Sequence, residues 1–343
     1  MKHILVIRFS AMGDVILTLP VIRSILNANT NLEITVVTKK PFAVLLSNIE
    51  RLHVVIAEVD EKHKSIFGIK KLYDELTSST SYDAVIDLHD VIRSRILSLL
   101  FRLSGTPIFR INKDRRSKKR MIATKELGPL MHTTQRYLEV FEKAGITIPS
   151  YSFAVPNIAV NEQDIRIAND FLSHHKHNFI GIAPFAKHAT KTLPIEKSEE
   201  LIRLLSENHS IFLLGGKEDE NQFLKWEKQF PSVHSTVSLS LLQQTALLSS
   251  MKAVISMDSA NMHLAAVQGI PVISIWGATH PYFGFSGIGT DKSTWISTHE
   301  HLPCRPCSVF GNKPCSNTSS PMACMNGINV AEIAQKVIAI TRG

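Results

Sequence analysis

Short apolar runs alternate with amphipathic helical patterns along the whole chain. In the first half, apolar runs predict strands over 3–8, 33–39, 53–57, 83–89 and 106–111. Between and after them, helical periodicity predicts helices over 14–27, 65–79, 91–105 and 133–145. Strands and helices that alternate in this way are typical of βαβ units around a parallel sheet.

The segment 146–160 interrupts this alternation, because it carries Pro149 and Pro156 and has no helical period, so we interpret it as a linker. Beyond it, strands are predicted over 179–184, 210–216, 253–257 and 271–277, and helices over 161–175, 195–208, 239–251, 330–340 and from Asp219 and Asp258. We therefore predict an α/β protein of two doubly wound, Rossmann-like halves with a cleft between them. The expected domains are 1–150 and 151–328, with a C-terminal helix, 329–343, that packs back on the first domain.

Composition supports a globular protein and restricts its partners. The 343 residues are 44% hydrophobic and 20% charged, and no apolar run is long enough to span a membrane. Arg8 breaks the apolar N-terminus, so we expect no signal peptide and a cytoplasmic protein, peripheral at most on the inner face of the cytoplasmic membrane. The net charge of +8 favours anionic partners, which include nucleic acids, phosphorylated sugars and membrane headgroups.

All four cysteines lie late in the chain with the spacing C-x2-C-x7-C-x8-C, at Cys304, Cys307, Cys315 and Cys324. A disulfide framework is not expected in a long chain without a signal peptide. Four thiolates at this spacing can hold zinc. The spacing is irregular and the segment resembles a loop, so we favour a reduced structural cluster and expect no metal and no cofactor.

Because ligands of doubly wound sheets bind at the carboxyl ends of strands, the motifs that follow strands are the candidate sites. Gly13 and Asp14 follow the first strand. Asp14 has two interpretations, as the cap of the next helix or as a general base that faces the cleft, with Gly13 allowing a ligand close.

The stretch 257–281 predicts a phosphate site. A strand ends at Asp258, and a helix follows with the small residues Ser259 and Ala260, whose free N–H groups suit an anion. We expect Asp258 to cap this helix and His263 to lie one turn into it, beside the anion.

Two further loops complete the predicted donor site. Lys187 and Lys191 are four residues apart after the strand over 179–184, and we interpret them as a pyrophosphate clamp. Glu218 follows a pair of glycines after the next strand, where a carboxylate can accept both hydroxyls of a ribose.

The segment 110–120 holds seven basic residues in eleven and reads as a basic loop. It contains no aromatic residue for stacking bases, so a phosphorylated or membrane-borne acceptor fits it better than a nucleic acid. The candidate acceptor-binding residues are Arg93, Arg115, Arg116, Lys118, Lys119 and Arg120.

Several common motifs do not occur. No G-x-G-x-x-G follows the first strand, and the chain has no G-x-x-x-x-G-K-[ST], no H-E-x-x-H and no D-x-D. If a sugar nucleotide binds, lysines and helix N-termini must therefore neutralise its diphosphate without a metal ion.

Four stretches in this order, "ILVIRFSAMGDVILTLPVIRSI", "DLHDVIRSRILSLL", "FLLGGKEDE" and "DSANMHLAAVQGIPVISIWGATHP", resemble the heptosyltransferases of lipopolysaccharide core synthesis, glycosyltransferase family 9. The resemblance spans nearly the whole chain, including the cysteine-bearing tail that ends in "ACMNGI".

This resemblance implies a GT-B fold and an inverting, metal-independent transfer, typically of heptose from ADP-heptose to an anionic lipopolysaccharide-core acceptor. It implies that Asp14 is the catalytic base, that Lys191 binds the donor phosphates and that Glu218 binds the ribose. Asp258, Ser259 and His263 match the family's D-[ST]-G-x-x-H motif, in which Ala260 here replaces the glycine.

Two alternatives stay open at this point. The same scaffold could bind a nucleotide or an anionic glycolipid without turnover, or it could be a GT-B-like sugar-nucleotide epimerase. A nucleic-acid-binding role ranks last, and we expect no nucleic-acid partner.

Overall fold

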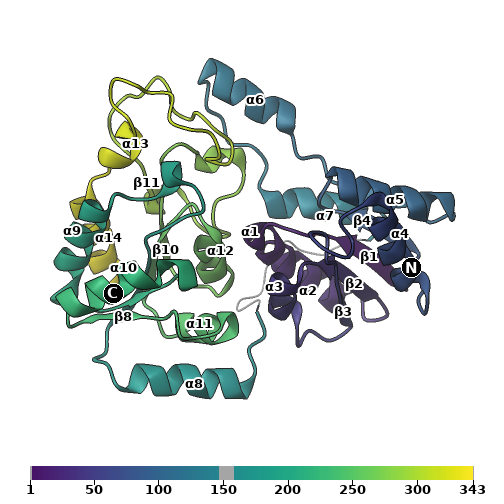
Figure 1. Cartoon of the computed structure of the whole chain (residues 1–343), viewed down its shortest axis with the longest axis horizontal. Helices are drawn as coiled ribbons and strands as arrows, with labels where there is room; N and C mark the ends of the chain where they lie inside the picture. The colour runs from purple at the N-terminus through teal and green to yellow at the C-terminus, as the bar shows by residue number, and fades with distance from the viewer. Residues whose placement is uncertain (1, 147–157, 343) are drawn as a thin grey trace. The chain divides into compact units, whose positions relative to one another are not determined.

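The computed structural model describes residues 2–146 and 158–342 (Figure 1). Internal contacts divide the chain into two compact units, the first from Met1–Lys113 and Thr133–Ala159 and the second from Asp114–His132 and Val160–Gly343. Most of the expected linker, 146–160, lies outside the described residues.

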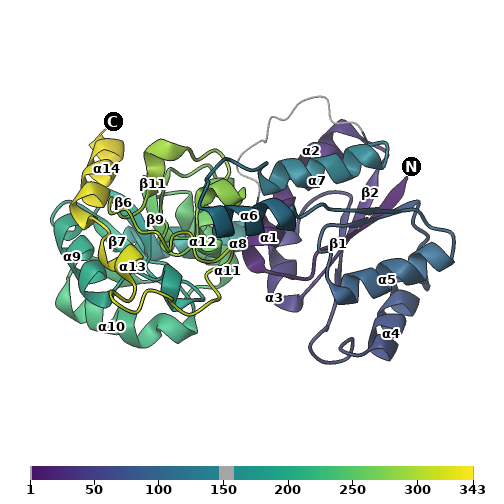
Figure 2. The ribbon, with the colours of Figure 1, turned by 90° about the horizontal axis from the view of Figure 1, so that it is seen from above.

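The first unit is an α/β layer structure around a parallel sheet, which in the described residues has five strands in the order β3-β2-β1-β4-β5. The strands are β1 (His3–Ile7), β2 (Glu33–Thr38), β3 (Leu52–Ile56), β4 (Ala84–Asp87) and β5 (Ile108–Arg110). The helices are α1 (Met12–Ile16), α2 (Thr18–Ala28), α3 (Lys40–Ala43), α4 (Ile66–Thr77), α5 (Ile92–Leu103) and α7 (Thr133–Lys143). Helices α4 and α5 cover one face of the sheet and α2 and α7 the other (Figure 2).

The helix expected over 14–27 is divided into α1 and α2 at Leu17. Pro20 explains the break, because proline has no N–H to donate to the carbonyl of Ile16 and its ring disfavours a continuous helix there. The short α1 therefore carries Asp14 separately from the buried α2.

The second unit has the same architecture, with six parallel strands among the described residues in the order β11-β10-β9-β6-β7-β8. The strands are β6 (Phe179–Ala183), β7 (Ser210–Leu213), β8 (Val233–Ser235), β9 (Ala253–Met257), β10 (Val272–Ile275) and β11 (Trp295–Ile296). The helices are α6 (Arg115–Thr124), α8 (Glu162–Ser173), α9 (Ile195–Ser206), α10 (Glu220–Gln229), α11 (Leu241–Leu248), α12 (Ala260–Val267), α13 (Ala323–Asn326) and α14 (Val330–Arg342). The edge strands β8 and β11 were not expected, because they are too short to show a hydrophobic period.

The units of the structure differ from the expected domains at two segments. The C-terminal helix α14, expected as a separate segment, belongs to the second unit, where Ile333 and Val337 lie in the apolar core that α9 and α10 share with the second sheet. The segment Asp114–His132 belongs to the second unit, where Lys125 Nζ donates to the carbonyl oxygens of Cys304 at 3.1 Å and Pro306 at 2.9 Å.

The basic segment expected as a loop is largely helix α6. Arginine, lysine, methionine and alanine are good helix formers, so the run of charge hid a favourable helix propensity. Across residues 2–146 and 158–342, no helix combines the length and the apolar character needed to cross a membrane.

Candidate active site

Four loops meet at the carboxyl edge of the second sheet, because β10, β9, β6 and β7 are neighbours and run in the same direction. The loop after β6 carries Lys191, the loop after β7 carries Glu218, β9 is followed by Asp258, and the loop after β10 carries Thr279. The edge includes the point where the strand order reverses on either side of β6, which is where doubly wound sheets bind their ligands.

Lys191 and Asp258 form an ion pair at this edge, with 3.3 Å between Lys191 Nζ and Asp258 Oδ2. The hydroxyl of Thr279 donates to the same oxygen at 2.7 Å. Asp258 is only 4% exposed, so the two contacts compensate the burial of its charge and fix the ammonium group of Lys191.

The sequence suggested that Asp258 caps α12. In the structure Asp258 is not the cap, because Ser259 occupies the N-cap position with an extended backbone. The Ser259 hydroxyl lies 3.2 Å from that of Ser256, and Asn261 Nδ2 donates to the carbonyl of Leu214 at 3.4 Å. These contacts tie the start of α12 to β9 and to the end of β7. His263 lies on the first turn of α12 and is buried, whereas Ala260 is half-buried.

The turn after β7 brings a carboxylate back over its own backbone. A side chain at Gly216 would overlap the carboxylate of Glu218, which would then have to move aside. Asp219 stabilises the turn by accepting the N–H of Gly216 at 3.0 Å. Glu218 and Lys187 are both exposed at the edge of the unit.

In the first unit, Asp14 is the third residue of α1, and Gly13 precedes it in the same turn. The Asp14 carboxylate accepts the N–H of Ala11 at 3.3 Å and forms an ion pair with Arg8. The side chain of Asp14 is 38% exposed, whereas that of Arg8 is 5% exposed. Asp14 thus stabilises the first turn of the helix and still presents part of its carboxylate to solvent.

Arg8 is a buried cation that stands out in the sequence only as a break in an apolar run. Its Nη1 donates to the carbonyl of Leu88 at 2.6 Å, and its guanidinium lies 6.0 Å from the ring centroid of Tyr137. The Tyr137 hydroxyl donates to the carbonyl of Asp14 at 3.2 Å. Burial opposes the charged form of Arg8, but Asp14, Tyr137 and Asp87 together outweigh it and raise the pKa of Arg8, so the pair persists as two charges.

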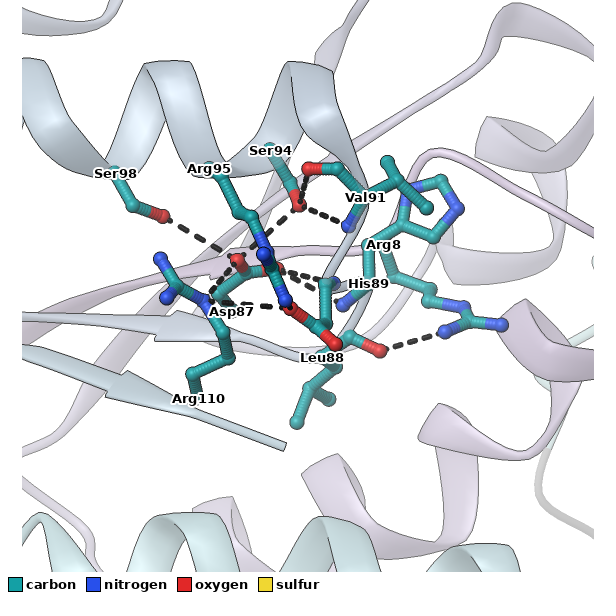
Figure 3. A network of polar contacts seen from close by, with 10 residues as sticks. Arg8, Asp87, Leu88, His89, Val91, Ser94, Arg95, Ser98 and Arg110 are labelled. Carbon is teal, nitrogen blue, oxygen red and sulfur yellow. Dashed lines mark hydrogen bonds and ion pairs between the residues drawn. The ribbon is translucent and has the colours of Figure 1, made fainter. Parts of the chain in front are cut away.

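A polar network at the end of β4 lies beside Arg8 (Figure 3). Asp87 is fully buried and accepts the N–H groups of His89 at 3.0 Å and Asp90 at 2.9 Å. Its other oxygen accepts Ser94 Oγ at 3.1 Å and Arg110 Nε at 3.0 Å. No role was predicted for Asp87 from the sequence, although an aspartate at the end of a buried strand was the available signal.

His89 is held in this network as a neutral imidazole. Burial, followed by the charges of Arg8 and Lys113, lowers its pKa from the usual 6.5 to about 3. Below pH 6.5 His89 therefore binds a proton in the unfolded chain but not in the folded protein. The free energy of unfolding consequently falls as the pH falls toward 3.

We expect His89→Gln to remove part of this acid sensitivity. Between about pH 7 and pH 5 the unfolding free energy of the variant should fall by roughly 1–2 kcal/mol less than that of the wild type. Urea unfolding at both pH values measures the difference. Equal losses of unfolding free energy in the wild type and the variant would contradict the assignment. His234→Gln removes another histidine whose pKa is lowered, and it serves as a comparison.

The candidate acceptor-binding residues lie in both units. Arg93 is on α5, with its Nη1 4.0 Å from Asp60 Oδ1. On α6, four of the predicted side chains are exposed, those of Arg115, Arg116, Lys119 and Arg120. Lys118 differs from them, because it is buried with its Nζ 5.5 Å from the ring centroid of Phe285.

The four cysteines line one small cavity in the second unit together with Arg305 and Met322. All four are free thiols, and burial raises the pKa of Cys307, and that of Cys324 to about 11. Within residues 2–146 and 158–342, no three histidine, cysteine or carboxylate side chains are arranged to hold a metal ion. The structure thus gathers the thiols without a zinc-binding arrangement.

The family model of glycosyltransferase family 9 (heptosyltransferase) matches residues 69–313, more than half of the chain. The chain belongs to glycosyltransferase family 9. Among the relatives of this family 9 enzyme is the lipopolysaccharide core heptosyltransferase OpsX of Haemophilus influenzae, 24% identical over 286 residues, 82% of this chain and 80% of OpsX.

Solved structures of family 9 share the fold of this glycosyltransferase. A family 9 glycosyl transferase from Veillonella parvula superposes with a TM-score of 0.79 at 19% identity, over 99% of this chain and 97% of that one. The heptosyltransferase WaaC of Escherichia coli, solved with ADP-2-deoxy-2-fluoro heptose, gives a TM-score of 0.67 at 21% identity, over 98% and 99%. The expected GT-B fold, with two parallel-sheet α/β domains, is therefore confirmed.

Proposed function

We propose that this glycosyltransferase moves heptose from ADP-heptose to a lipopolysaccharide-core acceptor, with inversion at the anomeric carbon and without a metal ion. The arrangement of Lys191, Asp258 and the start of α12 at one sheet edge is the observation that carries the proposal. Relatives named as lipopolysaccharide heptosyltransferases, and the ADP-sugar bound by WaaC, support the choice of donor and acceptor.

The second unit would hold the donor. The ammonium group of Lys191, fixed by Asp258, would neutralise charge that develops on the leaving diphosphate, and the N–H groups at Ser259 and Ala260 would hold its oxygens. Asp258 itself would not touch the phosphate, because its carboxylate would repel it. Exposed Glu218 would accept the ribose hydroxyls, and Lys187 would add a weaker, solvent-screened contact.

The first unit would supply the base. As the acceptor oxygen forms its bond to the anomeric carbon and the bond to the diphosphate breaks, Asp14 would take the acceptor proton. A carboxylate that is paired with Arg8 is a weak base toward a free alcohol. We therefore propose that the proton moves late, when the forming bond has made the hydroxyl acidic. Arg8 would keep the carboxylate in position until then.

Anionic groups of the acceptor would contact basic side chains from both units. Arg93 is available on α5, and the exposed residues Arg115, Arg116, Lys119 and Arg120 line α6. The buried Lys118 would support α6 through Phe285 and would not reach the acceptor itself. An acceptor with a lipid anchor would also bring the enzyme to the membrane surface.

A transfer assay tests the proposal. Purified protein, ADP-heptose and a heptose-free core acceptor should release ADP and give a product whose new glycosidic bond is inverted by NMR. Turnover should be unchanged in EDTA. ADP-heptose at 100 times its Kd should also stabilise the protein by about 2.7 kcal/mol.

Other outcomes point to the alternatives. Stabilisation by the ADP-sugar with no release of ADP would indicate a binding protein without turnover. Conversion of a nucleotide sugar without any acceptor would indicate an epimerase. A retained anomeric configuration or loss of turnover in EDTA would overturn the proposed chemistry.

A further inference from the structure

Helix α5 carries an apolar stripe that faces solvent. Ile92, Leu99 and Leu103 are 77%, 52% and 77% exposed, and half-buried Ile96 lies between them. With about 100° between successive residues of a helix, these four positions fall within roughly 60° of one another. The stripe therefore runs along one side of the helix for its whole length.

The buried face of α5 lies opposite. Leu97 and Phe101 pack in the apolar core of the first unit, and Phe101 stacks edge-on against Tyr73 of α4 at 4.8 Å between ring centroids. The core thus takes one face of α5 and, although Ile96 still packs against the core cluster, leaves Ile92, Leu99 and Leu103 exposed on the opposite face. An ordinary surface helix carries polar residues on that face.

The polar positions of α5 carry only positive charge. Its sequence, "IRSRILSLLFRL", contains three arginines and no acidic residue. Arg95 and Arg102 lie on one side of the apolar stripe, and Arg93 lies on the other. An exposed apolar stripe between basic side chains is typical of helices that lie in the interface of an anionic membrane.

Helix α4 extends this surface. Its first two residues, Ile66 and Phe67, are 68% and 86% exposed. Helices α4 and α5 pack side by side in both views (Figures 1 and 2), and both begin just beyond the carboxyl ends of strands. Phe67 and Ile92 therefore lie at the same end of the first unit, the end that also carries Asp14.

We propose that α5, with the start of α4, docks the enzyme on a membrane that contains anionic lipids. This proposal deepens the proposed function, on which it rests for a lipid-linked acceptor at the same sheet edge. Burial of the stripe among acyl chains would supply apolar free energy, and the flanking arginines would contact lipid phosphates. A second copy of the chain fits less well, because a symmetric pairing of α5 would bring arginines against arginines.

Cosedimentation with vesicles tests the surface. The full chain should bind vesicles of phosphatidylglycerol and phosphatidylcholine more tightly than vesicles of phosphatidylcholine alone. The triple variant Ile92→Gln/Leu99→Gln/Leu103→Gln should lose at least about tenfold in partitioning, since three apolar side chains no longer enter the bilayer. The matched control Leu204→Gln/Leu224→Gln, exposed on α9 and α10, should bind as the wild type does.

The charged part of the surface has its own variant. Arg102→Gln should weaken binding to the anionic vesicles about fivefold and should leave binding to neutral vesicles unchanged. Wild-type protein that ignores anionic vesicles, or a triple variant that binds them normally, would overturn the proposal. So would a wild-type dimer that the triple variant converts to monomer without any vesicle binding, because α5 would then be a contact between copies.

The two proposals can fail separately. With an acceptor stripped of its acyl chains, the triple variant should transfer sugar at the wild-type rate, because α5 would then have no membrane to bind. Both proposals are supported if the wild type transfers sugar and binds vesicles, whereas the triple variant transfers sugar but no longer binds vesicles. Vesicle binding without any transfer would leave the membrane surface standing and overturn the proposed function.

Discussion

Asp14→Asn is expected to lower turnover by about 10²–10⁴-fold, the usual contribution of a general base. The amide cannot take the acceptor proton, but its oxygen can still accept from Arg8. Arg8 also keeps its bond to the carbonyl of Leu88 and its position over Tyr137, so the first unit should stay folded. Steady-state release of ADP measures the loss, and a thermal shift with ADP measures nucleotide binding.

The control for this variant is Asp74→Asn, which removes an exposed carboxylate on α4 in the same unit. It should change neither turnover nor nucleotide binding. Near wild-type turnover in Asp14→Asn would reduce Asp14 to its structural role, in which it stabilises α1 through the N–H of Ala11. A loss of nucleotide binding as large as the loss of turnover would also contradict a role confined to proton transfer.

The hydrophobic pattern was sufficient to predict the parallel sheets and the edge at which the candidate residues gather. Buried parallel strands are short and almost purely apolar, and β1, β6 and β9 are examples in which nearly every side chain is buried. Once strands alternate with helices, the direction of each strand follows. Lys191, Glu218 and Asp258 could therefore be placed at one edge before any contact was known.

Contacts between residues distant in sequence could not be predicted. The partners of Asp258 come from the loops after β6 and β10, and only the folded sheet brings Lys191 and Thr279 to it. Locally, an aspartate before a small residue and a helix looks like a cap, so the sequence favoured the wrong role. The pairing of Arg8 with Asp14 was easier to predict, because a charged residue at the end of a buried strand needs a partner of opposite charge nearby.

The positions of segments that are held by packing could not be predicted from the sequence either. Helix α14 and the segment 114–132 both join the second unit through apolar and carbonyl contacts that no local pattern encodes. The second apolar face of α5 was visible as a period in the sequence, but its exposure was not. An apolar stripe in a sequence is interpreted as a core face until the structure shows which face of the helix packs on the sheet.

Lys191→Ala is expected to lower kcat/KM by about 10²–10³-fold, the cost of removing one group that stabilises charge in a transition state. The ammonium group is held by Asp258 at 3.3 Å, so its position costs no reorganisation when the diphosphate leaves. The substitution also removes the ion-pair partner of the buried Asp258 and leaves it the hydroxyl of Thr279, so a lower melting temperature should accompany the loss. Steady-state kinetics with ADP-heptose and differential scanning calorimetry measure the two effects.

Lys187→Ala is the matched control, since Lys187 lies four residues earlier on the same loop and is exposed. Solvent screens an exposed ammonium group, so its removal should cost less than about tenfold and should leave the melting temperature unchanged. If the two variants lost activity equally, the ion pair with Asp258 would have no part in catalysis. A Lys191→Ala enzyme that lost stability but kept its kcat/KM would restrict Lys191 to neutralising Asp258, and the diphosphate would then depend on the N–H groups at the start of α12.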